Sequence, residues 1–347
     1  MTSGTIALDT PAPASRYNEL AIWTFAFGYF ACYVPYAALT KALTDGLGPL
    51  ATHVVSGTVL LPATAVASTL AALAFLTAMR WWRFAHHVSV GALRLPRPTR
   101  WTFLSGLGSA TVIVTTTLAY SFRGISVVFM VLLMKGGVLV IAPIVDALSR
   151  RSVRWFSWLG LALSLATLAL TFTDADTRLT TAATLDVVAY LGAYFVRLSL
   201  MSHHAKSTDG EARLRFFVEE HMVASPALLA ILAVLALAGV PELRAGFGLL
   251  GQPGVLIPGV GVGLLSEGTG IFGGLVLLDP RENTFAVPVN RASSILAGVV
   301  GSLALAAMFG SPLPPARELL GAGLVLLAIV VLATPSLLGH AHLSRGR

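Results

Sequence analysis

Residues 126–146 read SVVFMVLLMKGGVLVIAPIVD, an apolar stretch interrupted near its middle by one cation, Lys135. A run of roughly 18 or more apolar residues can cross the hydrocarbon layer of a bilayer, about 30 Å thick, as an α-helix. Lys135 follows Ile125 by ten residues, which places it about 15 Å into such a helix at 1.5 Å per residue. The stretch therefore predicts a membrane-spanning helix that carries a charge near the bilayer centre.

The rest of the chain has the same apolar character. Of 347 residues, 56% are hydrophobic and 11% are charged, and the mean hydropathy is +0.80. Soluble domains carry about 25% charged residues, so the composition leaves no room for a soluble catalytic domain. A single cysteine, Cys32, excludes an internal disulfide and a thiolate metal site.

Apolar runs bounded by charged or turn residues predict an all-α integral membrane protein with ten transmembrane helices. The expected spans are residues 20–39, 50–79, 101–120, 125–147, 153–172, 184–202, 216–240, 254–278, 284–310 and 317–335. Residues 1–19 and 336–347 are expected to be cytoplasmic tails.

Basic residues divide unequally between alternate loops, and this predicts the orientation. One side carries 15 of them: Arg16, Arg80, Arg83, Arg94, Arg97, Arg100, Arg150, Arg151, Arg154, Lys206, Arg213, Arg215, Arg281, Arg345 and Arg347. The other carries five: Lys41, Arg123, Arg178, Arg244 and Arg317. By the positive-inside rule both termini and the loop 80–100 are expected in the cytoplasm. Frequent arginine and alanine favour a bacterial cytoplasmic membrane, and charges scattered along loops argue against nucleic-acid binding.

Parts of the first half of the chain recur in the second. At an offset of 161, Tyr29, Tyr33 and Tyr36 match Tyr190, Tyr194 and Arg197, and at an offset of 156 Lys135 matches Arg291. Five spans repeated once must cross the membrane in opposite orientations, because five is odd. The pattern predicts two inverted five-helix repeats, residues 20–172 and 184–335, with a binding site near the midplane between them.

Over roughly residues 20–335 the chain resembles the drug/metabolite transporter superfamily, including its EamA-like members. The resemblance rests on residues 126–146 followed by WLGLALSLATLAL (158–170), and on VPVNRASSILAGVV (287–300) followed by LLGAGLVLLAIVVL (319–332). It implies ten helices in two inverted repeats with both ends cytoplasmic. Basic residues inside the fourth and ninth helices are similar to the organophosphate and nucleotide-sugar branches. Simple exporters of the superfamily often carry Pro and then Glu late in the fourth helix, where this chain has Pro143 and Asp146.

Four charged residues fall inside the predicted spans: Lys135, Arg197, Glu267 and Arg291. Each costs about 2.5–3.5 kcal/mol at a helix centre, so each is expected to face protein or water. Three cations and one carboxylate favour an anionic ligand, held between Lys135 and Arg291. A structural ion pair between Lys135 and Glu267, and snorkelling of Arg197 to the interface, are the alternatives.

Aromatic and amide side chains complete the expected site. The substrate-binding set is Lys135, Arg291, Arg197, Tyr29, Tyr33, Tyr190, Tyr194 and Asn290. Glu267, on the glycine-rich span 254–278, is expected to carry a coupling proton or to act as a counter-ion. Helix packing with satisfied hydroxyl groups is the alternative for each tyrosine.

Other acidic residues are expected at the membrane surface. Glu219 and Glu220 begin a span beside the cytoplasm and are expected to be solvated. Asp146 precedes Arg150 by four residues, a spacing typical of an ion pair on one helical face. No catalytic residue, metal or cofactor is expected.

The sequence thus predicts a secondary active transporter that moves a small organic anion, such as an organophosphate or a nucleotide-linked metabolite, by alternating access. Export of neutral or amphiphilic metabolites or drugs is the alternative within this class. A membrane-embedded lipid-modifying enzyme is the alternative of another class, but the midplane holds one acid and three bases, which suits it poorly. The expected partners are a small-molecule substrate and the lipid bilayer, without nucleic acid; a homodimer is left open.

Overall fold

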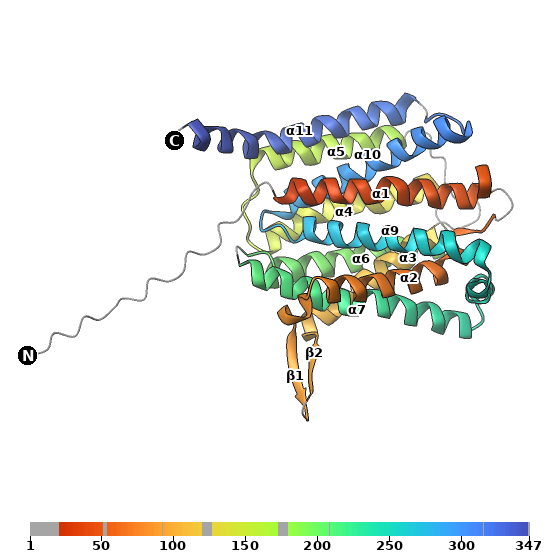
Figure 1. The fold of residues 1–347 in the computed structure, drawn as a ribbon. Coiled ribbons are helices and arrows are strands. Elements are labelled where there is room, and N and C mark those ends of the chain that lie inside the picture. Colours follow the sequence, from red (N-terminus) through yellow and green to blue (C-terminus); the bar gives the residue numbers. More distant parts are fainter. Residues whose placement is uncertain are drawn as a thin grey trace, which may run out of the picture.

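The computed structural model describes residues 21–50, 54–91, 93–119, 127–172, 180–207, 209–314 and 316–345, and most of these form α-helices that run alongside one another (Figure 1). The helices are α1 (Ala21–Asp45), α2 (Gly57–Ala78), α3 (Arg100–Ala119), α4 (Val127–Leu148), α5 (Trp155–Phe172), α6 (Thr181–His204), α7 (Gly210–Leu237), α8 (Pro241–Gly248), α9 (Pro253–Leu277), α10 (Asn283–Phe309) and α11 (Ala316–Arg345). Short 3-10 helices span Gly48–Leu50, Trp81–Phe84 and Leu249–Gly251.

The expected all-α membrane class is confirmed. Among the described residues, six helices are long and apolar enough to cross a membrane, namely α1, α2, α6, α7, α9 and α10, and shorter apolar segments lie within α5 and α11. A long helix also overlaps each of the ten expected spans. The chain is therefore a multi-pass, membrane-associated protein. Helix α11 continues to Arg345, where a tail from residue 336 onward was expected.

The loop expected at residues 80–100 contains a β-hairpin. Strand β1 (His86–Val90) pairs antiparallel with β2 (Leu93–Arg97), and His86 lies opposite Arg97. Gly91 begins the turn with a φ of +62°, a conformation that glycine adopts without steric cost. The hairpin projects from the side of the helical bundle, across the direction of the helices (Figure 1). We call the end of the bundle that carries it the basic end.

Helices of the two halves of the chain interleave. The main packing partners are α1 with α9 and α10, α2 with α9, α3 with α6 and α7, α4 with α6, and α5 with α11. Two glycines permit especially close approaches between these helices. A Cβ atom on Gly106 of α3 would lie 2.6 Å from Cβ of Val223 on α7, and one on Gly263 of α9 would lie 2.5 Å from Cβ of Ala67 on α2. Only a residue without a side chain fits at either position.

Helix α10 begins at a carboxylate supplied by another helix. Oδ1 of Asp146, at the end of α4, accepts hydrogen bonds of 2.8 Å from the backbone N–H and side-chain amide of Asn283. Oδ2 accepts bonds of 2.7 Å from the backbone N–H and hydroxyl of Thr284. The expected pairing of Asp146 with Arg150 is wrong, because α4 ends at Leu148 and the turn beyond it carries Arg150 away from that helical face.

We expect Asp146→Ala to lower the free energy of unfolding by about 2–4 kcal/mol, since it leaves four donors at the start of α10 without their buried acceptor. Denaturation in mixed micelles, followed by circular dichroism, measures the change. Asp45→Ala is the matched control, because Asp45 forms an exposed i,i+4 pair with Lys41 and exposed pairs contribute little. Equal losses in the two variants would contradict the capping role.

Candidate functional site

Two groups of aromatic and cationic side chains lie in the interior of the bundle. In the first, the rings of Tyr29 and Tyr33, one helical turn apart on α1, have centroids 5.5 Å apart and planes inclined at 55°. The ammonium nitrogen of Lys135, on α4, lies 5.7 Å from the centroid of the Tyr33 ring. A cation at this distance is attracted by the negative face of the ring. No ion pair or hydrogen bond joins Lys135 to another described residue.

The second group repeats this arrangement. Tyr190 and Tyr194 on α6 have ring centroids 5.0 Å apart and planes at 54°. The guanidinium carbon of Arg291, on α10, lies 4.8 Å from the centroid of the Tyr194 ring. Arg291 is only 6% exposed, and no described residue forms a hydrogen bond with its Nε or with one terminal nitrogen, Nη2.

A cavity of about 320 Å³ lies beside these groups. Seven helices line it, and its polar wall includes six residues of the expected site: Tyr29, Tyr33, Tyr194, Arg197, Glu267 and Asn290. Lys135, Arg291 and Tyr190 are not among the described residues that line it. Each cation instead stacks on a tyrosine ring that does line it. The two cations are therefore one aromatic ring away from the cavity.

Arg197 is neutralised by an acid that the sequence reasoning assigned to the surface. Glu220, on α7, is fully buried, so the expectation that it is solvated is wrong. Its carboxylate accepts hydrogen bonds from Nε of Arg197 at 2.7 Å and from Nη2 at 3.2 Å. Hydroxyl groups of Ser105 and Ser109, on α3, donate to the same carboxylate at 2.7 and 2.9 Å. Only Lys135 and Arg291 then remain as interior cations without a carboxylate partner among the described residues.

Glu267 faces the same cavity from α9. Its Oε2 accepts a hydrogen bond of 3.3 Å from the Ser225 hydroxyl, while its buried Oε1 has no partner in the part of the chain that the structure describes. The alternative of a structural ion pair with Lys135 is not realised in this structure, because neither residue forms an ion pair with any described residue. Glu267 is thus a nearly buried carboxylate with one oxygen that no described residue satisfies.

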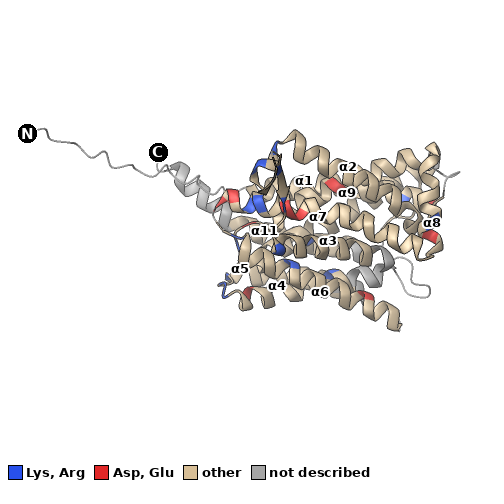
Figure 2. Cartoon of the chain, turned by 90° about the horizontal axis from the view of Figure 1, so that it is seen from below, with Lys and Arg blue, Asp and Glu red and all other residues tan. Residues whose placement is uncertain are grey.

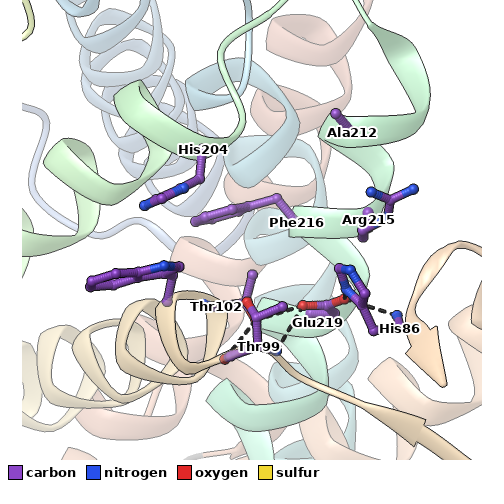
Figure 3. A pocket seen from close by; sticks show the side chains of 9 residues that line it. His86, Thr99, Thr102, His204, Ala212, Arg215, Phe216 and Glu219 are labelled. Atoms are coloured by element: carbon purple, nitrogen blue, oxygen red, sulfur yellow. Dashed lines mark hydrogen bonds and ion pairs between the residues drawn. The ribbon is translucent and has the colours of Figure 1, made fainter. Parts of the chain in front are cut away.

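Glu219 binds the root of the hairpin to α7. Its carboxylate accepts hydrogen bonds from the backbone N–H groups of His86 and Thr99 at 2.9 and 3.0 Å, and from the Thr102 hydroxyl at 2.7 Å. The His86 ring nitrogen Nδ1 lies 2.6 Å from the same carboxylate. Glu219 is fully buried, so its expected solvation is also wrong. These residues border a small cavity of about 160 Å³ at the basic end (Figure 3).

Buried backbone and charged groups join the remaining loops at the basic end. Arg151, after α4, donates to the carbonyl oxygens of Pro280 at 2.9 Å and Lys206 at 2.7 Å. The Lys206 ammonium donates to the carbonyl oxygen of Arg281 at 3.1 Å. Burial lowers the pKa of Lys206 from its ordinary 10.5 to about 8, against the opposing attraction of Asp146. The loops of the two halves are thus bonded together at this end.

Comparison with known proteins yields a likeness of fold. No family model matches the chain, and no curated protein matches it. Among 26 matching chains of solved structures is one described in the words "Crystal structure of protein". It is 14% identical, has a TM-score of 0.54, and the match covers 91% of this chain and 97% of that one. At this identity the two share a fold, and the comparison says nothing of function.

Proposed function

We propose that the chain is a secondary active transporter that moves a small organic anion across the membrane by alternating access. The observation that carries the proposal is Arg291, a buried guanidinium that is always ionised. Two of its N–H-bearing nitrogens have no partner within the described part of the chain. Burying such a charge without a partner is costly. A phosphate or carboxylate entering the cavity and displacing the Tyr194 ring would supply the missing acceptors bidentately.

Three correspondences support two inverted five-helix repeats and ten spans. In the proposed repeat, helices α1 to α5 correspond in order to α6, α7, α9, α10 and α11. The helix contacts α1–α9, α2–α9 and α1–α10 then correspond to the contacts α6–α3, α7–α3 and α6–α4. All six of these contacts occur. The close approach of Gly106 to Val223 is matched by that of Gly263 to Ala67. The same exchange relates the two tyrosine–cation groups.

The cavity and the basic end together support alternating access. The lining residues lie along the middle of the helices and reach Thr40 of α1 and Gly57 of α2 toward the end opposite the hairpin; on α9 they also reach Leu277, the last residue of that helix, toward the basic end. On α7 the lining stops at Glu220, and the preceding residue, Glu219, is bonded to the hairpin root. We take the bonded hairpin root and the lining that reaches Gly57 as support for a carrier that is closed at the basic end and accessible from the other end.

The distribution of charge supports a cytoplasmic assignment of the closed side. Most of the coloured Lys and Arg residues gather at the end of the bundle that carries the hairpin (Figure 2). By the positive-inside rule this end faces the cytoplasm. The carrier would then face outward in the described state, and both termini would be cytoplasmic, in a bacterial cytoplasmic membrane.

Transport itself is tested by binding followed by counterflow. Purified protein is screened by thermal shift against organic phosphates, carboxylates, and neutral and cationic compounds of similar size. A compound that stabilises the protein is then loaded into proteoliposomes, and uptake of its radiolabelled form from outside is measured. We expect accumulation driven by the internal unlabelled compound, which a channel or an enzyme does not produce. Binding without counterflow would contradict the transport proposal.

Thiol accessibility tests the outward-facing arrangement. In a Cys32→Ala background, a membrane-impermeant maleimide added outside intact cells is expected to label Thr116→Cys, on the cavity wall of α3. It should leave Ser202→Cys, buried at the basic end, unlabelled. Labelling from inside-out vesicles should not reach Thr116→Cys. The reverse pattern would invert the orientation and refute the cytoplasmic assignment of the basic end.

Glu267 is expected to couple transport to protons. Ionised, the carboxylate keeps one buried oxygen that has no partner among the described residues; protonated, it needs only one acceptor. Glu267→Gln should therefore retain exchange of internal for external substrate but lose acceleration of uptake by an imposed pH gradient. Ser225→Ala, which removes only the hydroxyl that binds Glu267, serves as the control and should keep the acceleration. A wild-type protein insensitive to the gradient would exclude the coupling role.

A neutral or amphiphilic substrate is the second candidate, and one observation favours it. The cation that lines the cavity among the described residues, Arg197, is already paired with Glu220. The wall is otherwise rich in tyrosine, threonine and serine side chains, which suit an organic body of low charge. The same thermal-shift panel separates the two candidates, because only the binding of an anion should depend on Lys135 and Arg291.

A further inference from the structure

Toward its tip the hairpin presents one apolar and one polar face, while at its root the face with the apolar residues carries the pair His86 and Arg97. In its antiparallel register Val88 lies opposite Leu95, and these residues share a face with Leu93, two positions away on β2. Ser89 lies opposite Arg94 on the other face. Leu93 is 67% exposed and Leu95 is 46% exposed, so the chain itself does not cover the apolar face. An isolated two-stranded hairpin is only marginally stable in water, and an uncovered apolar face makes it less so.

The orientation of the hairpin is fixed at its root. Glu219 of α7 holds the first residue of β1, His86, and Thr99 just after β2. From this root the strands extend sideways from the bundle, across the helix direction (Figure 1). In a protein whose helices cross a bilayer, that direction lies along the membrane surface.

Unpaired positive charge surrounds the hairpin. Five arginines lie on it or beside it, namely Arg80, Arg83, Arg94, Arg97 and Arg100, and none forms an ion pair with a described residue. Trp81 and Trp82 precede the strands and Trp101 follows them, and tryptophan is enriched where polypeptide meets the headgroup layer. The arginines and tryptophans around the hairpin are therefore suited to a membrane surface, where anionic headgroups adjoin apolar acyl chains.

We propose that the hairpin is a lipid-binding element that lies in the membrane interface, with Leu93 and Leu95 at the acyl chains and the neighbouring arginines on phosphates of anionic headgroups. Amphipathic segments bind there by burying apolar area about 5–10 Å into the boundary between headgroups and acyl chains. Each basic residue near an anionic surface contributes about 1 kcal/mol. The site binds membrane lipid and is independent of the transported solute.

Site-specific fluorescence tests this. In a Cys32→Ala background, Leu93→Cys and Ser89→Cys are labelled with an environment-sensitive fluorophore and reconstituted into phosphatidylcholine vesicles containing a small fraction of spin-labelled lipid. We expect quenching at Leu93→Cys more than about twofold stronger than at Ser89→Cys, because only the former position is buried among lipid. Similar weak quenching at both positions would show that the hairpin projects into water and would overturn the proposal.

Headgroup selectivity is tested with the same label at Leu93→Cys. Spin-labelled phosphatidylglycerol should quench more strongly than spin-labelled phosphatidylcholine, and Arg94→Gln with Arg97→Gln should reduce the preference by about fivefold for each arginine removed. Arg244→Gln, at the opposite end of the bundle, is the control and should leave it unchanged. Equal quenching by the two lipids, or energy transfer between labelled copies that rises with protein density, would assign the face to something other than anionic lipid and overturn the proposal.

Discussion

Arg291→Gln is expected to weaken binding of an organic anion at least about thirtyfold and to abolish its transport. Removing one member of a buried, hydrogen-bonded charge pair costs about 2–5 kcal/mol, and Arg291 is a buried cation whose Nε and Nη2 have no hydrogen-bond partner among the described residues. Arg291→Lys should restore part of the affinity, because it returns the charge without the planar fork that binds two oxygens at once. Lys135→Gln should weaken binding too, but less, since an ammonium group binds as a point charge.

Affinities for the organic phosphate or carboxylate found by thermal shift are measured by calorimetry, and folding is followed by size-exclusion profile. Arg244→Gln is the matched control, since Arg244 bonds the carbonyl of Ala236 away from the cavity. It should change neither binding nor transport. If the Arg291→Gln variant folds and binds the anion as tightly as the wild type does, the proposal of an anionic substrate fails. A neutral or amphiphilic substrate is then the better-supported candidate.

Arg197→Met is expected to lower the free energy of unfolding by about 3–5 kcal/mol, because it leaves the buried Glu220 carboxylate without its cation. Ser105 and Ser109 would remain as its neutral donors. The double variant Arg197→Met with Glu220→Met should recover most of the loss, since replacing both members of a buried pair by apolar side chains is often neutral.

Unfolding of the single and double variants in mixed micelles completes a double-mutant cycle. Lys41→Met, from an exposed pair with Asp45, is the control and should have little effect. Binding by the double variant distinguishes the two roles of Arg197. If the double variant keeps its affinity for the anion, Arg197 has a structural role. If its affinity falls as much as that of Arg291→Gln, Arg197 also binds the substrate. A single variant as stable as the wild type would contradict the importance of the pair.

The sequence by itself determined the helices and the interior cations. Hydropathy is a local property, and a run such as residues 126–146 must form its backbone hydrogen bonds within one helix if it lies in lipid. For this reason each expected span overlaps a long helix. The positions of Lys135 and Arg291 within their helices follow from counting residues along the sequence. The repeat offsets match these two cations with each other and match Tyr33 with Tyr194. In the structure each cation lies against the tyrosine of its own half of the chain.

Only the tertiary structure decided which polar groups meet. Glu220 and Asp146 looked like surface acids because each stands near the end of an apolar run. Arg197 of α6 reaches Glu220 of α7, and Asp146 of α4 reaches the start of α10, 137 residues later. Lys135 and Glu267 each remain without an ion pair, although their opposite charges suggested one. The sequence gives the position of a charged residue along its helix. The rotation and packing of each helix decide which distant helix that residue faces, and therefore whether the buried charge finds a partner.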